Sequence, residues 1–140
     1  MKTGKVKIVF KDFQFLGQDS IDAALFGRAV WEAYPDHYYE WSTAMYEAQD
    51  DEGDRGFGDL ESIQKLTKTL SGIDADKVTK LMNDKKTQYQ AAIEADRTEA
   101  SSMGVNGTPS VIVGTKLFSA LSPAAFTSGI SAEIDAELKK

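Results

Sequence analysis

The sequence of 140 residues contains no cysteine, three prolines and a single histidine. The lack of cysteine excludes Cys-ligated zinc, iron–sulfur clusters, disulfides and a cysteine nucleophile within this chain. One histidine cannot build a zinc site that needs several imidazoles. No apolar run approaches the ~20 residues that a membrane span requires, and the first residues lack the apolar stretch of a signal peptide. We therefore expect no cofactor and no membrane span.

The charge is acidic, with 16 Lys and Arg against 22 Asp and Glu, which gives a net charge of −6. This balance argues against nucleic acid or an anionic membrane as the main partner, because both need a basic surface. Hydrophobic residues make up 41% of the chain, which is enough for a packed core. Composition alone predicts an acidic globular protein of one domain.

The spacing of apolar residues predicts a strand, then helices, then a hairpin and a last helix. In residues 5–10, Val6, Ile8 and Phe10 alternate with other side chains, which predicts a strand with one buried face. A helix is expected over residues 21–34, with Asp19 or Ser20 as its N-cap. A second helix should begin at Pro35, and another after the cap residue Asp74. The expected helices also include 60–70 and a long polar one that ends at Gly104.

The pattern then changes from the helical period to a short apolar run. Residues 110–113 predict a short buried strand, and Gly114 with Thr115 a tight turn to a return strand over 116–119. Ser122 and Pro123 should begin a final helix. The residues expected on one face of that helix are Phe126, Ile130, Ile134 and Leu138. This order predicts a small mixed sheet with a helical insertion.

The sharpest local motif is the segment 104–113, in which Pro109 directly precedes an apolar strand. Proline cannot donate to a sheet ladder, so its place there is unusual. One solution is a cis Thr108–Pro109 bond that leaves the Thr108 backbone facing outward, where it can pair with an extended peptide. The alternative is an ordinary turn with a trans proline at the first residue of the strand.

Two further features have ordinary interpretations beside the functional ones. Asp50, Glu52, Asp54 and Glu61 have the spacing of an EF-hand calcium loop, but Arg55 stands where that loop needs glycine, so a solvated acidic loop is the alternative. His37 could belong to a Ser–His–Asp triad, or be a surface histidine at a helix end.

The motif Gly104-Val105-x-Gly107-Thr108-Pro109, followed by a strand and hairpin, resembles the cis-proline loop of DsbA-like thiol–disulfide oxidoreductases. The segment 6–17 is similar to a core strand of that family and the start of its helical insert. Residues 38–46, with Tyr38, Trp41 and Tyr46, resemble another family segment, and the final helix also fits. The resemblance implies an α/β, thioredoxin-like, three-layer fold with a helical insertion at about 19–103 of a single domain, 1–140.

The chain departs from that family at its beginning. Family members start with a strand and a Cys-x-x-Cys motif at the start of a helix, and the sequence has neither. The expectation is an N-terminally truncated member that lacks the catalytic cysteines, so that no catalytic residue can be carried over. The family's substrate-binding loop can be assigned to this sequence, at Gly107, Thr108 and Pro109. The parent is expected to exchange disulfides with extracytoplasmic proteins, and this chain alone to be inactive.

Other functions remain open at this stage. A redox-inactive module of thioredoxin fold could use the same loop to bind an extended peptide or protein, and a calcium-binding helical domain is a third hypothesis. The resemblance also predicts that the missing strand lies between residues 5–10 and 110–114. Exposed strand edges there would favour a homo-oligomer.

Overall fold

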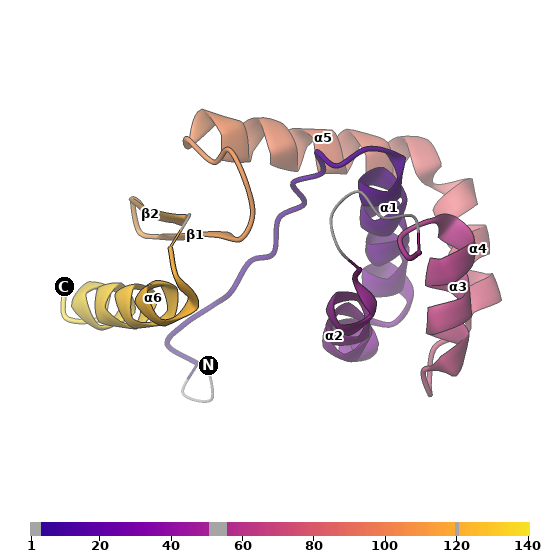
Figure 1. Ribbon diagram of the computed structural model, residues 1–140, viewed down its shortest axis with the longest axis horizontal. Coiled ribbons are helices and arrows are strands. Elements are labelled where there is room, and N and C mark those ends of the chain that lie inside the picture. The colour runs from indigo at the N-terminus through magenta and orange to yellow at the C-terminus, as the bar shows by residue number, and fades with distance from the viewer. Residues whose placement is uncertain (1–3, 51–55, 120) are drawn as a thin grey trace. The chain divides into compact units, whose positions relative to one another are not determined.

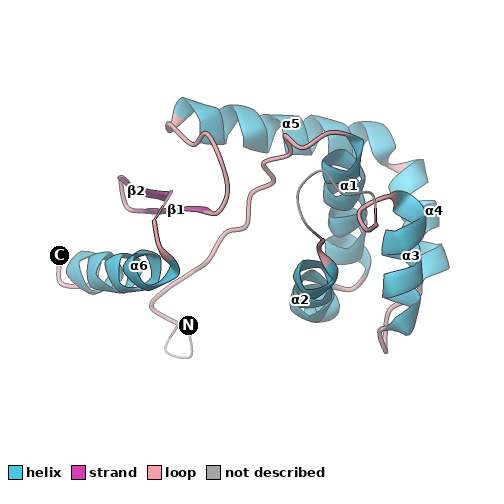
Figure 2. Cartoon of the chain, viewed as in Figure 1, coloured by secondary structure: helices cyan, strands magenta, loops and turns pink. Residues whose placement is uncertain are grey.

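The computed structural model describes residues 4–50, 56–119 and 121–140. The chain forms two compact units, of which unit 2 is Gln14–Glu94 and unit 1 combines Met1–Phe13 with Ala95–Lys140. Figures 1 and 2 show the elements. In chain order they are α1 Gln18–Ala33, the 3₁₀ helix η1 Pro35–His37, α2 Tyr38–Ala48, α3 Leu60–Thr69, α4 Ala75–Asp84, α5 Lys86–Ser102, β1 Ser110–Val113, β2 Lys116–Ser119 and α6 Pro123–Glu137. Within the described residues, no helix is long and apolar enough to cross a membrane.

Unit 2 is built around α1, which packs against α2, α3 and α4. The apolar residues of this helix are buried, and Leu25, Phe26 and Val30 are almost completely inaccessible. Val78 of α4 and Ile63 of α3 complete the centre of the core. The helical core therefore lies in unit 2, where each helix contributes one apolar stripe.

Trp41 joins α2 to two neighbouring helices. Gly27 of α1 allows its close approach, because a Cβ at Gly27 would lie 3.2 Å from the Trp41 ring. The indole Nε1 donates to Oγ1 of Thr67 at 3.0 Å, and this hydroxyl donates in turn to the Ile63 carbonyl at 2.8 Å. All polar atoms of this buried contact are thus partnered, as a stable core requires.

Side-chain caps begin α3, α4 and α6. The predicted cap Asp74 accepts from the backbone N–H groups of Asp76 and Lys77, both at 3.0 Å. The predicted cap Ser122 accepts from the N–H of Ala125 at 3.4 Å. Asp59 begins α3 in the same way. These residues satisfy donors that the first turn of a helix leaves without an intrahelical partner.

Asp59 should make the stability of unit 2 sensitive to acid. The backbone N–H of Ser62 donates to its Oδ1 at 2.8 Å, and this hydrogen bond holds the pKa of Asp59 below its ordinary value. A carboxylate with a depressed pKa in the folded state stabilises the fold above its unfolded pKa of about 3.9. That contribution is lost as the pH falls through the lower, folded pKa. In thermal melts between about pH 5 and pH 2, Asp59→Asn should lose less stability on acidification than the parent chain.

Glu61→Gln is the matched control, because it removes a neighbouring carboxylate from the same first turn without touching the cap. It should retain the acid dependence of the parent. An unchanged acid dependence in Asp59→Asn would contradict the assignment of this carboxylate.

Unit 1 contains the hairpin that the sequence predicted. β1 and β2 pair antiparallel, with Val111 opposite Phe118 and Val113 opposite Lys116, and Gly114 takes a positive φ of 59° in the turn. Helix α6 packs on both strands (Figure 1). Gly129 permits this contact, because a Cβ there would lie 3.0 Å from the ring of Phe118. Phe118 is 6% exposed and is the buried anchor of the hairpin.

The strand predicted over residues 5–10 is not formed. These residues belong to no strand, and β1 and β2 make the only sheet in the described part of the chain. The face expected to be buried is open, with Ile8 53% and Phe10 62% exposed. A strand needs a neighbour for its backbone groups, and alternation in the sequence cannot supply one.

Two smaller predictions about helix ends were also wrong. Helix α1 begins at Gln18 with Gly17 as N-cap, at φ 92°, instead of Asp19 or Ser20. A glycine is favourable here because it adopts positive φ without steric cost. At the other end of the chain, Leu138 is 50% exposed and lies beyond the last residue of α6, so it does not join the helix face proposed for it.

Candidate functional site

The loop between α5 and β1 carries the predicted site residues. Gly104 ends the helical region with φ 84°, and its N–H donates to the Ser101 carbonyl at 3.0 Å. The Thr108–Pro109 peptide bond is cis. Thr108 and Pro109 are exposed and Gly107 is half-buried. The three residues form one continuous surface segment immediately before β1.

Ser110 fixes the end of this loop, and the sequence analysis did not single it out. Its Oγ donates to the carbonyl of Gly107 at 2.7 Å, across Thr108 and Pro109. Such a serine-to-backbone bond closes a turn locally. The sequence pattern behind this hydrogen bond is a serine three residues after a glycine, and this pattern is too common to predict such a bond.

The loop has the chemistry of a binding surface. Exposed backbone groups next to a sheet can pair with an extended peptide, and their hydrogen bonds depend little on the peptide's sequence. The chain has no cysteine, and Thr108 is the one hydroxyl among Gly107, Thr108 and Pro109. These three residues can position a bound segment, but they provide no sulfur for thiol–disulfide exchange.

Asp50 of the acidic loop and His37 make local contacts in the part of the chain that the structure describes. Asp50 Oδ2 accepts from the backbone N–H of Phe57 at 2.9 Å, which closes the loop before α3. Glu52 and Asp54 lie outside the described residues, and the described part of the chain holds no cluster of three or more His, Asp or Glu suited to a metal. His37 lies 3.5 Å from Glu40 on the same helical stretch.

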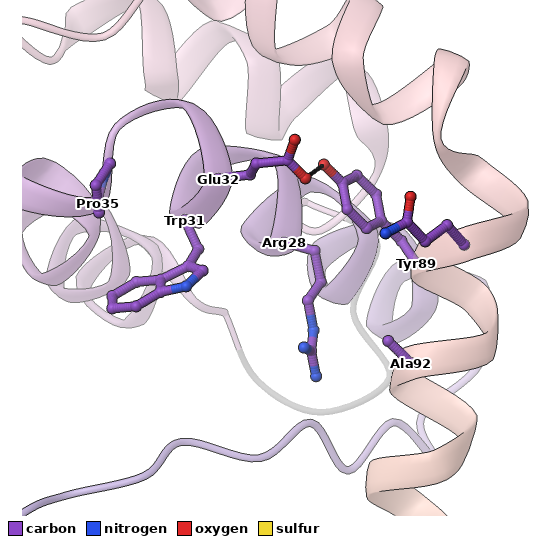
Figure 3. Close-up of a pocket in the computed structure, with 7 residues that line it drawn as sticks. Arg28, Trp31, Glu32, Pro35, Tyr89 and Ala92 are labelled. Carbon is purple, nitrogen blue, oxygen red and sulfur yellow. Dashed lines mark hydrogen bonds between the residues drawn. The ribbon is translucent and has the colours of Figure 1, made fainter.

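Unit 2 carries a groove of about 400 Å³ that the sequence did not predict. Figure 3 shows Trp31 of α1 on one side and Tyr89 and Ala92 of α5 on the other, with Arg28 of α1 between them. Trp31 is 57% exposed, and its ring meets the edge of Tyr38 with centroids 5.4 Å apart. The groove is open and has an exposed aromatic side chain beside charged and polar ones.

A three-membered polar network borders this groove. Tyr89 donates from its hydroxyl to Glu32 at 2.7 Å (Figure 3). Lys85 forms an ion pair with the same carboxylate. The hydrogen bond from Lys85, and then that from Tyr89, lower the pKa of Glu32. Burial, followed by the hydrogen bond to Glu32, raises the pKa of Tyr89. The network keeps Glu32 ionised and Tyr89 neutral, and it ties α1 to the start of α5.

The family model described as "Thioredoxin" matches residues 1–132 of this chain. The chain belongs to this thioredoxin family. The relatives of similar sequence and the solved structures of similar fold are DsbA-like proteins. These likenesses confirm the thioredoxin-like fold class predicted from the sequence.

Two curated relatives are named as probable disulfide bond formation protein D. The protein of Bacillus anthracis is 28% identical over 141 residues, which cover 98% of this chain and 60% of that protein. The Bacillus cereus protein is 26% identical over 114 residues, which cover 81% of this chain and 52% of that protein. The chain thus spans between half and two thirds of the length of these relatives.

Two crystal structures have the same fold. The thiol–disulfide exchange protein alpha-DsbA2 from Wolbachia pipientis superposes with a TM-score of 0.79 at 28% identity, over 96% of this chain and 67% of that one. BdbD from Bacillus subtilis, in its oxidised form, superposes with a TM-score of 0.70 at 21% identity, over 86% and 64% of the two chains. At 21% identity, the likeness to BdbD shows a common fold only.

Proposed function

We propose that this chain is the C-terminal portion of a DsbA-like thiol–disulfide oxidoreductase, whose cysteines lie on a strand–helix unit outside it. The observation that carries the proposal is a mismatch in coverage. The similarity to a disulfide bond formation protein covers 98% of this chain but 60% of that relative, and this chain has no cysteine. The part of the relative that is not matched has room for the catalytic unit.

In this proposal the chain binds the substrate and the absent unit does the chemistry. A thiolate of the reduced protein attacks the disulfide of the oxidised protein, so that this S–S bond breaks and a mixed disulfide joins the two proteins. The second thiolate of the reduced protein then attacks the mixed disulfide. The reduced protein thereby gains a disulfide, and the other protein leaves as a dithiol. Gly107, Thr108 and Pro109 align the extended peptide or protein substrate beside the reacting sulfurs.

The same proposal includes domain organisation and location. We assign residues 1–140 to a single, partial DsbA-like domain in which about 19–103 are the helical insertion. The parent acts on extracytoplasmic substrates at the cell surface or in the periplasm, because proteins of the DsbA type carry out disulfide exchange where disulfides persist.

A second candidate function is a redox-inactive, peptide-binding module of thioredoxin fold. The absence of cysteine favours it, since a chain without sulfur nucleophiles can still offer the loop at Gly107, Thr108 and Pro109. The reading frame upstream of the Met1 codon separates the two candidates. A strand followed by Cys-x-x-Cys and a helix supports the oxidoreductase, and an upstream sequence without cysteine supports the binding module.

The activity assay is a direct test. Refolding of ribonuclease with scrambled disulfides should proceed at the uncatalysed rate in the presence of this chain, because the chain cannot form a mixed disulfide. Joining it to the strand–helix unit of the Bacillus anthracis relative should accelerate refolding. The matched control joins the same unit with both cysteines changed to serine. Turnover by the chain alone, or no gain from a folded fusion, would contradict the proposal.

A further inference from the structure

Ser110 supplies the hydrogen bond that holds the middle of the loop between α5 and β1. The loop begins where the N–H groups of Gly104 and Val105 donate to carbonyls of α5, both at 3.0 Å. It ends where Ser110 enters β1, opposite Ser119 of β2. Between these anchors, the Ser110 Oγ donates to the Gly107 carbonyl at 2.7 Å. The orientation of this carbonyl therefore depends on one hydroxyl.

This hydrogen bond also fixes the direction of the amide group that follows. The Gly107 carbonyl and the Thr108 N–H belong to one planar, trans peptide unit. In such a unit the N–H points opposite to the carbonyl, so a carbonyl directed at Ser110 leaves the N–H directed away from it. Thr108 is exposed, and its N–H donates to no backbone carbonyl in the described part of the chain. The Thr108 N–H is therefore available to a bound molecule.

The bond from Ser110 strengthens this N–H as a donor as well. A carbonyl that accepts a hydrogen bond polarises its own peptide unit, and linked hydrogen bonds strengthen one another by about 10–30% each. Pro109 has no N–H, so Thr108 carries the only N–H donor of this pair. An extended peptide that binds beside a sheet uses main-chain hydrogen bonds. The donor that such a peptide meets at this loop is thus the one that Ser110 controls.

We propose that Ser110 is a positioning residue for substrate binding. Its hydroxyl orients and polarises the peptide unit between Gly107 and Thr108, so that the Thr108 N–H donates to a main-chain carbonyl of an extended polypeptide. The inference rests on the proposed function, in which this loop holds the substrate. Because the contact is to the main chain, the substrate class is an unfolded segment with no required side chain.

Binding of reduced, carboxymethylated ribonuclease to the full chain tests the role of Ser110. This probe stays unfolded and has no free thiol, so its binding needs no disulfide chemistry. Ser110→Ala should bind it about 2- to 10-fold more weakly than the parent chain, the value of one neutral hydrogen bond. Ser110→Thr keeps the hydroxyl on a residue suited to a strand and should bind like the parent.

Ser119→Ala is the matched control, because it removes a serine hydroxyl from the position opposite Ser110 without touching the loop. Its affinity for the probe should equal that of the parent. In ¹⁵N NMR spectra, Ser110→Ala should shift the Thr108 amide resonance more than the amides of β2. A general loss of packing would instead shift resonances throughout the hairpin.

Kinetics of the fusion to the strand–helix unit of the Bacillus anthracis relative give a further readout. Ser110→Ala should raise the KM for scrambled ribonuclease by the same factor and leave kcat unchanged, because the lost contact holds substrate and transition state alike. A variant that merely folded less completely would lose kcat at constant KM.

The two experiments separate this inference from the proposed function. A folded fusion that is inactive contradicts the oxidoreductase, while binding of carboxymethylated ribonuclease by the chain alone still decides the role of Ser110. The inference is overturned if the parent chain does not bind this probe, or if folded Ser110→Ala binds it as tightly as the parent. A loss of affinity that Ser119→Ala shares also overturns it.

Discussion

Phe26→Ala should lower the free energy of unfolding of unit 2 by about 3–5 kcal/mol. Phe26 is completely buried on α1, and its ring stacks on Trp41 with centroids 6.0 Å apart and an interplanar angle of 21°. Truncation removes the transfer energy of the ring, leaves a cavity among packed helices, and removes the aromatic pair. Urea unfolding followed by tryptophan fluorescence measures this loss.

Tyr46→Ala is the control for this substitution. It removes an aromatic ring from α2, but Tyr46 is 73% exposed and its loss should change the free energy of unfolding by no more than about 0.5 kcal/mol. Equal effects of the two substitutions would show that the α1 core does not carry the stability of this unit.

Thr67→Val should destabilise the chain by about 1–3 kcal/mol, although valine has nearly the same shape as threonine. The substitution leaves the Nε1–H of Trp41 without its acceptor in a region where Trp41 is 4% exposed and Thr67 is inaccessible. A buried donor without a partner pays its full desolvation cost, so the loss exceeds the net value of one hydrogen bond.

A double-mutant cycle with Trp41→Phe separates this effect from packing. Phenylalanine has no N–H group, so Thr67→Val should cost little in that background. Equilibrium unfolding of the four proteins gives the coupling energy, which should be at least about 1 kcal/mol in the direction of cooperation. A coupling near zero would mean that the hydroxyl acts only through its bond to the Ile63 carbonyl.

The sequence predicted those elements whose determinants are local. The hairpin was correct in both strands and in its turn, because the apolar run before Gly114, the turn and the return strand lie within ten residues. The caps at Asp74 and Ser122 were correct for the same reason. The strand at 5–10 failed because its formation depends on a neighbour distant in sequence, which alternation does not reveal.

The candidate site was predicted only in part for a similar reason. Pro109 before an apolar strand located the loop, since a proline at that place restricts the backbone directly. The groove at Trp31 could not be foreseen, because it requires the packing of α1 against α5 across more than fifty residues of sequence.

The division of the chain into units has a consequence for its synthesis. Unit 2 is one uninterrupted stretch, Gln14–Glu94, whereas unit 1 needs both ends of the chain. On the ribosome the helical unit can therefore complete its local contacts while β1, β2 and α6 are still untranslated. The apolar residues 8–10 emerge before unit 2 and therefore wait until the rest of unit 1 has been made. During this interval their exposed apolar side chains are prone to aggregation.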